Sequence, residues 1–397
     1  MLDYTEALSR VLANINIAPA RELNVLAAGG LVLAQDIIAD ADMPAFDRSA
    51  MDGFAVRSED TKTPDSILTK VGEQSAGGDV TKGTVMNRAL APGECAAIYT
   101  GAPIPAGADA VVMVERTREE NGKIYISTAV ARGDHVRYQG EDVKKGELLI
   151  TAGRELRPQE IAICATFGYP RVRAVPKPKI IILSTGDELV PIANVPGPGQ
   201  IRDSNAAMVA AQAARAGGEI VDMRTVRDEL DIIKSEIESA AARADVLVLS
   251  GGVSMGAYDY VAPALQQLGF AGGFHKVKIK PGKPIWFGER GAVRAFGLPG
   301  NPVSSFVTFE LFVRPAIAKM LGQEPGPMFK KALVEGGPTK GADREQFVPA
   351  IVKNGLLTFI PWTSSADFIE LSRANALARV PIGAAPAAGD EIAWLPI

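Results

Sequence analysis

The sequence has few residues that form cross-links or bind soft metals. Its 397 residues include only two cysteines, Cys95 and Cys164, and two histidines, His135 and His275. Two cysteines exclude a disulfide framework and fit a reducing compartment, so we expect both to be small buried apolar residues. The scarcity of thiols and imidazoles also argues against a closed zinc site. Any metal should therefore be a hard, oxygen-ligated cation such as Mg²⁺.

Long apolar runs and a strong excess of one charge are also missing. The N-terminal stretch MLDYTEALSRVLANI has no basic start, and no run of about 20 apolar residues predicts a membrane span. We therefore expect a cytoplasmic protein without a membrane partner. The formal net charge of −4 predicts no general attraction to nucleic acid, so an anion site has to arise from a local arrangement.

The chain is long enough for two to four domains. Leu8, Leu12 and Ile15 have helical spacing, and a second apolar stretch covers 23–38. Short alternating runs separated by Gly, Pro and Asn-Gly turns predict β structure, whereas strands that alternate with helices predict a parallel α/β sheet. We predict a helix-rich scaffold at 1–48 and 141–175, an inserted β domain at 49–140, an α/β domain at 176–325 and a C-terminal β domain at 326–397.

Four polar or Gly-rich loops follow predicted strands of the α/β domain. Ligands of open parallel sheets bind beyond the carboxyl ends of the strands, so these loops should line one rim. Glycines in turns and Asp or Asn at helix starts explain each loop equally well when it is taken alone. No Gly-Lys-Ser/Thr or GxGxxG pattern occurs, which disfavours a P-loop nucleotidase or a Rossmann dehydrogenase. Together the loops predict a site for an anionic, phosphate-bearing ligand at Thr185, Gly186, Gly251, Gly252, Ser254, Gly256, Gly300 and Pro302.

Three lysines alternate with apolar residues at the start of the motif IKPGKP and just before it. Alternation places Lys276, Lys278 and Lys280 on one face of a predicted strand. A solvated edge strand would use lysines in the same way, but the nearby Gly-rich rim favours anion binding. His275 is expected to pack rather than to catalyse. Asp52, Thr100 and Asp142 lie outside this domain, in motifs that by themselves are typical of turns.

The motifs FDRSAMDGFAVR, TGAPIPAGADAVV, GEDVKKGELL, LSTGDEL, IRDSN, SGGVSMGAYDY, IKPGKP and LPGNPVSS occur in this order along nearly the whole chain. In this combination the chain resembles the molybdopterin molybdenumtransferase family, of the MoeA and gephyrin E-domain type. The resemblance implies a multidomain α/β protein: a molybdopterin-binding-like α/β domain, a helical scaffold, a β-rich insertion and a C-terminal β barrel. It also implies a homodimer with an active cleft shared between subunits, and a molybdopterin-adenylylating enzyme as upstream partner.

In this family, adenylyl-molybdopterin is hydrolysed in the presence of Mg²⁺ and molybdate, molybdenum enters the dithiolene, and AMP leaves. Carried over by motif, the catalytic residues are Asp52, Asp142, Glu188, Asp228, Asp259, Lys276 and Lys280. Further binding residues are Thr100, Pro299, Pro302, Arg344 and Ser365, with Ser364 as an alternative to Ser365. Asp228 and Asp259 are the candidate Mg²⁺ ligands. Phe54 stands where the family often has Tyr, which removes one hydroxyl.

Two alternatives to a molybdenum insertase remain at this point. One is a molybdopterin adenylyltransferase, which would use a similar α/β domain and ATP. The other is a non-catalytic scaffold like the anchoring role of gephyrin. The additional domains disfavour the first, and retention of the acidic and lysine positions disfavours the second. The sequence does not distinguish molybdate from tungstate, because both are tetrahedral dianions of nearly equal size.

Overall fold

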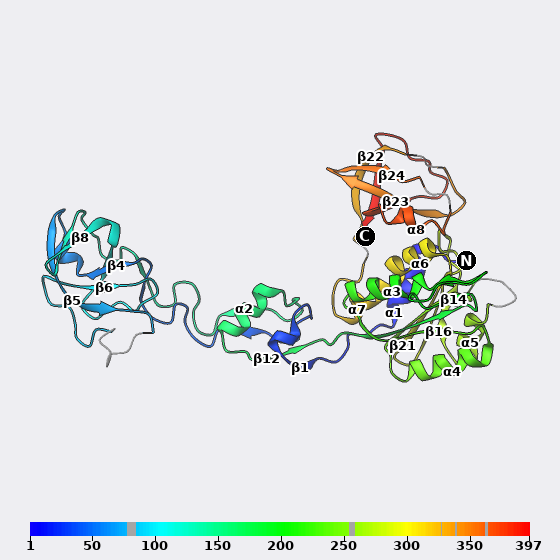
Figure 1. Ribbon diagram of the computed structural model, residues 1–397, viewed down its shortest axis with the longest axis horizontal. Coiled ribbons are helices and arrows are strands. Elements are labelled where there is room, and N and C mark those ends of the chain that lie inside the picture. Colours follow the sequence, from blue (N-terminus) through cyan, green and yellow to red (C-terminus); the bar gives the residue numbers. More distant parts are fainter. Residues whose placement is uncertain (78–84, 254–258, 327, 338–339, 362–363) are drawn as a thin grey trace. The chain divides into compact units, whose positions relative to one another are not determined.

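The computed structural model describes residues 1–77, 85–253, 259–326, 328–337, 340–361 and 364–397. The chain divides into two compact units, whose elements are labelled in Figure 1. The larger unit comprises Met1–Gln35, Gly153–Arg157 and Arg171–Ile397, and the smaller comprises Asp36–Ala152 and Pro158–Pro170. The finer division into four domains stays a prediction. Within the described ranges, no helix has the length and apolar character that crossing a membrane requires.

A six-stranded sheet in the order β16-β13-β17-β21-β20-β18 forms the centre of the larger unit. The first four strands are mutually parallel, and β20 and β18 run antiparallel at one edge. The strands are β13 (Lys179–Thr185), β16 (Glu219–Val226), β17 (Val246–Ser250), β18 (Ala271–His275), β20 (Trp286–Arg290) and β21 (Val293–Leu298). This confirms the predicted α/β fold and adds two strands joined by antiparallel pairing, of which only β20 runs opposite to the parallel strands.

Helices cover both faces of this sheet, which explains the almost continuous apolar sequence of its central strands. Successive side chains point to opposite faces: Ile180 and Ile182 belong to one core, and Ile181 and Leu183 to the other. The first face carries α1 (Tyr4–Ala13), α3 (Ser204–Arg215), α6 (Pro302–Thr308), the π-helical η5 (Phe309–Val313) and α7 (Arg314–Met320). The second carries α4 (Leu230–Ala241) and α5 (Val261–Gln267) (Figure 1).

The N-terminal region is less helical than predicted. The helix expected from Leu8, Leu12 and Ile15 is α1, which packs on the α/β core. The stretch 23–38 is not a helix: it contains the end of β1 (Arg21–Asn24), the short 3₁₀ helix η1 (Val25–Ala28) and β2 (Ile37–Ile38). Strand β1 pairs with β12 (Arg171–Ala174). A short apolar run does not distinguish a helix from paired strands, and the strand partners lie more than 100 residues away.

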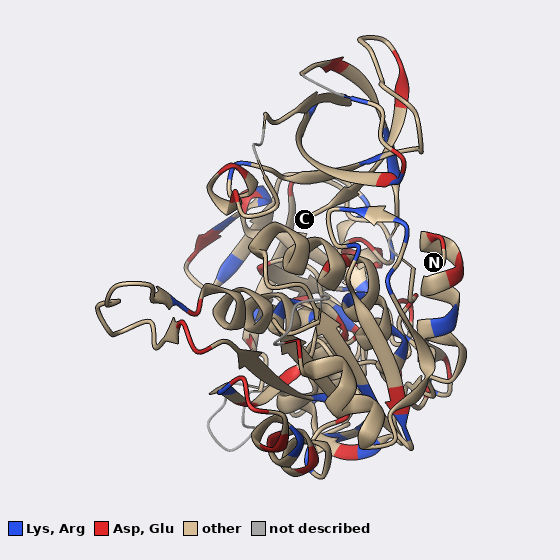
Figure 2. Cartoon of the chain, turned by 90° about the vertical axis from the view of Figure 1, so that its right-hand side faces the viewer, with Lys and Arg blue, Asp and Glu red and all other residues tan. Residues whose placement is uncertain are grey.

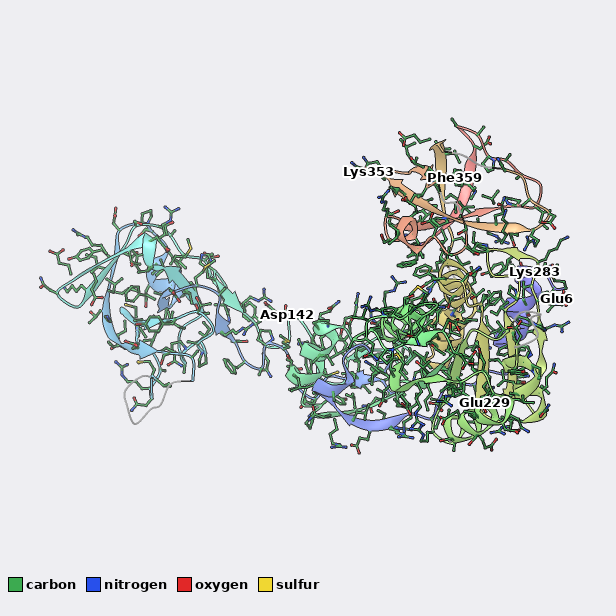
Figure 3. All side chains as sticks on the ribbon, turned by 45° about the vertical axis from the view of Figure 1, so that its right-hand side comes forward. Glu6, Asp142, Glu229, Lys283, Lys353 and Phe359 are labelled. Carbon is green, nitrogen blue, oxygen red and sulfur yellow. The ribbon has the colours of Figure 1, made fainter. Side chains whose placement is uncertain are left out.

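The C-terminal β domain is a closed barrel, as the resemblance implied. Its strands pair in the circular order β23-β24-β22-β26-β25-β23. They are β22 (Lys330–Gly336), β23 (Glu345–Lys353), β24 (Leu356–Phe359), β25 (Ala376–Val380) and β26 (Glu391–Pro396), with the short helix α8 (Phe368–Leu371). Phe359, labelled in Figure 3, is 1% exposed within the barrel core. One strand of the α/β domain, β19 (Ile279–Lys280), pairs with β23 and joins the domain to the barrel.

The smaller unit has its own six-stranded sheet, in the order β7-β4-β6-β5-β9-β8. Its strands are β4 (Gly53–Val56), β5 (Ser66–Gln74), β6 (Glu94–Ile98), β7 (Ala110–Met113), β8 (Thr117–Glu120) and β9 (Lys123–Ile126). The unit also contains β3 (Arg48–Ser49), β10 (Val136–Arg137), β11 (Leu148–Ile150) and the predicted helix α2 (Pro158–Thr166). Cys95 and Cys164 are fully buried, as expected, and burial raises the pKa of the Cys95 thiol to about 12.

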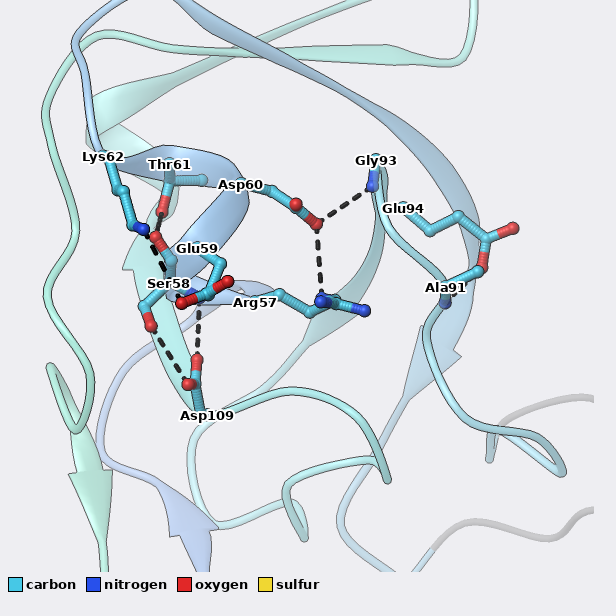
Figure 4. Close-up of polar contacts among 10 residues, drawn as sticks. All are labelled: Arg57, Ser58, Glu59, Asp60, Thr61, Lys62, Ala91, Gly93, Glu94 and Asp109. Carbon is cyan, nitrogen blue, oxygen red and sulfur yellow. Dashed lines mark hydrogen bonds and ion pairs between the residues drawn. The ribbon is translucent and has the colours of Figure 1, made fainter.

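Side-chain carboxylates hold a 3₁₀ turn, η2 (Ser58–Thr61), against the sheet of this unit (Figure 4). Asp109 accepts hydrogen bonds from the backbone N–H of Ser58 at 2.7 Å and from its hydroxyl at 3.0 Å. Asp60 accepts one from the Gly93 N–H at 2.9 Å. Such bonds satisfy backbone donors that a short helix leaves without partners.

Candidate functional site

A pocket of about 1540 Å³ lies in the larger unit, between the carboxyl ends of the parallel strands and the C-terminal barrel. This is the rim predicted from the sequence. Twelve of the predicted site residues line the pocket: Thr185, Glu188, Asp228, Gly251, Gly252, Asp259, Lys280, Pro299, Gly300, Pro302, Arg344 and Ser365. The barrel contributes the last two, so the pocket has walls from two domains.

Glycines allow the loops of the rim to approach one another closely. Gly251 has a φ of +91°, and a Cβ there would lie 2.5 Å from the carbonyl oxygen of Thr185. Its own N–H donates to the Leu298 carbonyl at 3.2 Å, so the loop after β17 is packed between the ends of β13 and β21. Asn205 reinforces this packing by donating to the Gly300 carbonyl at 2.7 Å and to the Ser250 hydroxyl at 3.0 Å.

The α/β side of the pocket is acidic. Glu188, Asp203, Asp228 and Asp259 all line it. Burial, followed by the negative charge of Asp187 and to a lesser extent of Glu188, raises the pKa of the Asp228 carboxyl, against the opposing effect of the neighbouring Thr185 hydroxyl. Among the described residues, Asp228 Oδ1 is buried and has no hydrogen-bond partner. A buried carboxylate oxygen without a donor, beside further negative charge, is an arrangement that a cation would stabilise.

Positive charge enters the same pocket from the junction with the barrel. Lys280, Lys283, Lys340 and Arg344 line it there, and Arg202 in β15 (Ile201–Arg202) adds one cation on the α/β side. Elsewhere in this unit acidic and basic residues are interspersed, as Figure 2 shows. The pocket therefore presents carboxylates from the strand ends and cations from the junction to one ligand.

Ser365 ties the barrel to the start of α6. Its hydroxyl accepts a hydrogen bond from Asn301 Nδ2 at 2.7 Å, and its carbonyl accepts one from the Val303 N–H at 3.0 Å. Asn301 is the predicted N-cap and Pro302 the first helical residue, but the Asn301 side chain bonds to Ser365 instead of capping the helix. Ser364 also lines the pocket, so both serine alternatives remain.

Not every predicted residue lines the pocket. The predicted strand with three lysines on one face is wrong: β18 ends at His275, and Lys276 has a φ of +74°, which turns the chain. Only Lys280 of the three faces the pocket. Gly186 does not line the pocket. A Cβ at this position would lie 2.7 Å from Glu188 Oε2. Ser254 and Gly256 lie outside the described residues.

Three predicted residues belong to the smaller unit. Thr100 donates to Asp52 Oδ1 through its N–H at 2.7 Å and its hydroxyl at 2.8 Å. These two bonds lower the pKa of the exposed Asp52 carboxyl, which therefore stays ionised at neutral pH. Asp142 accepts from Arg137 Nη2 at 2.5 Å. The turn motifs thus hold two exposed, partnered carboxylates.

The structure adds pocket residues that were not predicted: Asp203, Asn205, Lys283 and Lys340. Asp203 is 7% exposed and caps α3 by accepting from the Ala206 N–H at 3.0 Å. Asp203, Asn205 and Lys283 belong to the motifs IRDSN and IKPGKP. The signal that could have identified them is a polar residue before a helix or within a Gly-Pro turn, because such a residue lies near a strand end. No local pattern marked Lys340.

Comparison with known proteins agrees with this architecture. Residues 2–168 match the MoeA N-terminal region (domains I and II), 181–319 a probable molybdopterin binding domain, and 334–397 the MoeA C-terminal region (domain IV). The molybdopterin molybdenumtransferase of Bacillus subtilis is 37% identical over 88% of this chain and 83% of its own length. That of a Nostoc species is 37% identical over 91% and 85%. The chain belongs to the molybdopterin molybdenumtransferase family.

A solved member of this family has the same fold. The molybdopterin biosynthesis MoeA protein of Pyrococcus horikoshii superposes with a TM-score of 0.81 at 32% identity, covering 100% of this chain and of that one. The resemblance inferred from the motifs, the fold class and the assignment to an enzyme family are confirmed. Membership places the chain in molybdenum cofactor biosynthesis.

The acidic side of the pocket fits Mg²⁺ in the kind of donor it offers. Asp228 and Asp259 supply oxygen ligands, and Asp228 Oδ1 is the buried atom without a partner. Within the described ranges, no three His, Cys, Asp or Glu side chains converge as a metal cluster. Mg²⁺ commonly takes one or two carboxylates and completes its shell with water and substrate phosphate. At this site, water and substrate oxygens would therefore complete the coordination of an Mg²⁺ ion.

The raised pKa of Asp228 has a consequence for stability. Because the folded state disfavours the ionised form, Asp228→Asn should raise the melting temperature at about pH 7, where the carboxylate is charged in both states. The gain should disappear as the pH falls below the usual Asp range, about pH 4, because wild-type Asp228 is then neutral too. Thermal unfolding at a series of pH values without divalent cation measures this difference.

The adjacent residue provides the control. Glu229, labelled in Figure 3, is exposed and makes no side-chain cap for α4, so Glu229→Gln should leave the melting temperature nearly unchanged at every pH. A lower melting temperature for Asp228→Asn at neutral pH would show that the folded protein does not disfavour the ionised form of Asp228.

Proposed function

We propose that this chain inserts molybdate into molybdopterin by Mg²⁺-dependent cleavage of adenylyl-molybdopterin, with release of AMP. The observation that carries the proposal is the mixed lining of one pocket. Carboxylates follow parallel strands on one side, and four cations enter from the barrel junction. An adenylylated substrate carries a pyrophosphate, and molybdate is a dianion, so the pocket must offset negative charge and place a cation near phosphate.

The residues of the pocket supply distinct functions in this proposal. Lys280 and the loop of Gly251 and Gly252 bind the phosphates, through charge and backbone N–H groups. Arg344 and Ser365 on the barrel side bind the oxyanion. Asp228 and Asp259 would hold Mg²⁺, and the bound ion would supply Lewis-acid polarisation of a phosphate oxygen. No residue is assigned as general base.

We further propose that the active form is a homodimer in which Asp52, Thr100 and Asp142 complete the cleft of another subunit. Their support is chemical: Asp52 is held ionised and exposed by Thr100, in a family motif distant in sequence from the rim. The adenylylating enzyme that supplies the substrate is the proposed upstream partner, and the cytoplasm the proposed location.

Purified protein incubated with adenylyl-molybdopterin, Mg²⁺ and molybdate tests the proposal directly. We expect AMP release that requires both the oxyanion and the cation, measured by chromatography of the nucleotide. Replacing molybdate by tungstate in a parallel reaction determines the oxyanion preference. Absence of AMP release would contradict the proposal, and ATP-dependent adenylylation of molybdopterin would support an adenylyltransferase instead.

A further inference from the structure

Two pocket cations lie where the α/β domain joins the barrel: Lys280 on β19 and Arg344 directly before β23. In the ladder between β19 and β23, Ile279 lies opposite Glu345 and Lys280 opposite Gln346. The Glu345 N–H donates to the Lys278 carbonyl at 3.2 Å, and Arg344 Nη1 donates to the Ile279 carbonyl at 3.4 Å. Because the ladder spans only two residues, little backbone pairing fixes Lys280 relative to Arg344.

An ion pair lies directly behind this ladder. Arg379 on β25 donates through Nε to Glu345 Oε1 at 2.6 Å. The guanidinium lies against a pair of aromatic rings that contact each other edge to face, 5.2 Å from the centre of Tyr4 and 5.1 Å from that of Phe329. The side chains of Arg379 and Glu345 are 31% and 16% exposed. Aromatic contacts and partial burial strengthen such a pair relative to one in open water.

The N-terminal segment connects the same ion pair to the α/β domain. Tyr4, at the start of α1, is 3% exposed, and burial raises the pKa of its hydroxyl, which keeps the ring neutral. Two residues earlier, the Leu2 carbonyl accepts from the Lys278 N–H at 2.8 Å. Arg379 thus contacts two parts of the junction. One is Glu345, the first residue of β23 and the neighbour of Arg344, and the other is the N-terminal segment that supports β19.

We propose that Arg379 is a positioning residue for oxyanion binding. Its ion pair with Glu345, packed against the rings of Tyr4 and Phe329, holds β23 against β19 and so sets the distance between Arg344 and Lys280 across the pocket. Arg379 does not line the pocket and acts through Arg344. The consequence for molybdate rests on the proposed function, whereas the effect on the ladder does not.

The ladder can be tested without turnover, by hydrogen–deuterium exchange. Arg379→Met keeps an apolar side chain against the rings and removes the charge, and Glu345→Gln removes the other charge with little change in volume. Both should speed amide exchange in 277–283 and 344–347 by at least about tenfold, because the short ladder opens more often. Arg379→Lys should show a smaller increase, since it keeps the charge but loses the planar donor.

The barrel offers a matched control. Lys331 and Glu391 form an ion pair of the same length, 2.6 Å, with side chains 74% and 54% exposed. Lys331→Met should leave exchange at 277–283 and 344–347 unchanged. Unchanged exchange in both Arg379→Met and Glu345→Gln would overturn the proposal, as would an equal acceleration in Lys331→Met.

Kinetics then test whether Arg379 acts through Arg344. Arg379→Met should raise the KM for molybdate in AMP release by about ten- to a hundredfold, the range for one charged hydrogen bond, with a smaller effect on kcat. In an Arg344→Ala background, Arg379→Met should raise the KM for molybdate hardly further, because the side chain that Arg379 positions is absent. Additive effects would overturn the positioning role. If the wild type releases no AMP, the proposed function is contradicted. Hydrogen–deuterium exchange would still decide whether Arg379 stabilises the ladder.

Discussion

Asp259→Ala and Lys280→Ala should each leave the fold intact and reduce molybdate-dependent AMP release by at least about a hundredfold. Both residues line the pocket, and Lys280 is exposed there, so neither substitution opens a cavity in a core. Lys280 is the one lysine of the predicted three that lines the pocket, and Asp259 contributes a carboxylate to its lining. Steady-state AMP release, with circular dichroism to check folding, measures the effect.

Two surface residues outside the pocket provide matched controls. Asp231 has a side chain 97% exposed, and Lys353, labelled in Figure 3, is exposed at the end of β23. Asp231→Ala and Lys353→Ala remove the same charges without touching the pocket, so AMP release should match the wild type. Normal activity in both Asp259→Ala and Lys280→Ala would exclude this pocket as the site.

Gly251→Ala should damage both stability and activity. The residue has a φ of +91°, and the new methyl group would lie 2.5 Å from the Thr185 carbonyl oxygen, a backbone atom that cannot rotate away. We expect the free energy of unfolding to fall by about 1–3 kcal/mol. We also expect AMP release to fall, because the loops after β13 and β17 must separate. Denaturant unfolding and the AMP assay measure the two effects.

Gly291→Ala is the control that separates the energetic cost of a left-handed backbone from the cost of the close contact with Thr185. Gly291 has a φ of +57° in the turn between β20 and β21, and a Cβ there would meet no atom within 4 Å. Gly291→Ala should therefore lose about 1 kcal/mol, the cost of a left-handed residue, and keep full AMP release. An equal stability loss in both variants, with normal activity in Gly251→Ala, would show that the rim tolerates the methyl group.

Much of the site was predictable because strand–loop junctions are local features. An apolar strand followed by Gly or Asp marks a residue at a strand end, and parallel strands place all such ends on one edge. Thr185, Glu188, Asp228 and Gly251 were found in this way. The barrel contribution of Arg344 and Ser365 came from family motifs, because no local pattern links β23 to the rim.

The sequence by itself determined the α/β domain, its rim and the family, since apolar periodicity and motif order depend on neighbouring residues. Tertiary structure alone decided three matters: that both ends of 23–38 pair as strands, that Lys276 does not line the pocket, and that Arg379 pairs with Glu345, the neighbour of Arg344. The first and third depend on partners distant in the chain, whose pairing no local pattern encodes. The second depends on the positive φ of Lys276. A turn of this kind usually has Gly or Asn at that position, so the Lys gave no sign of it in the sequence.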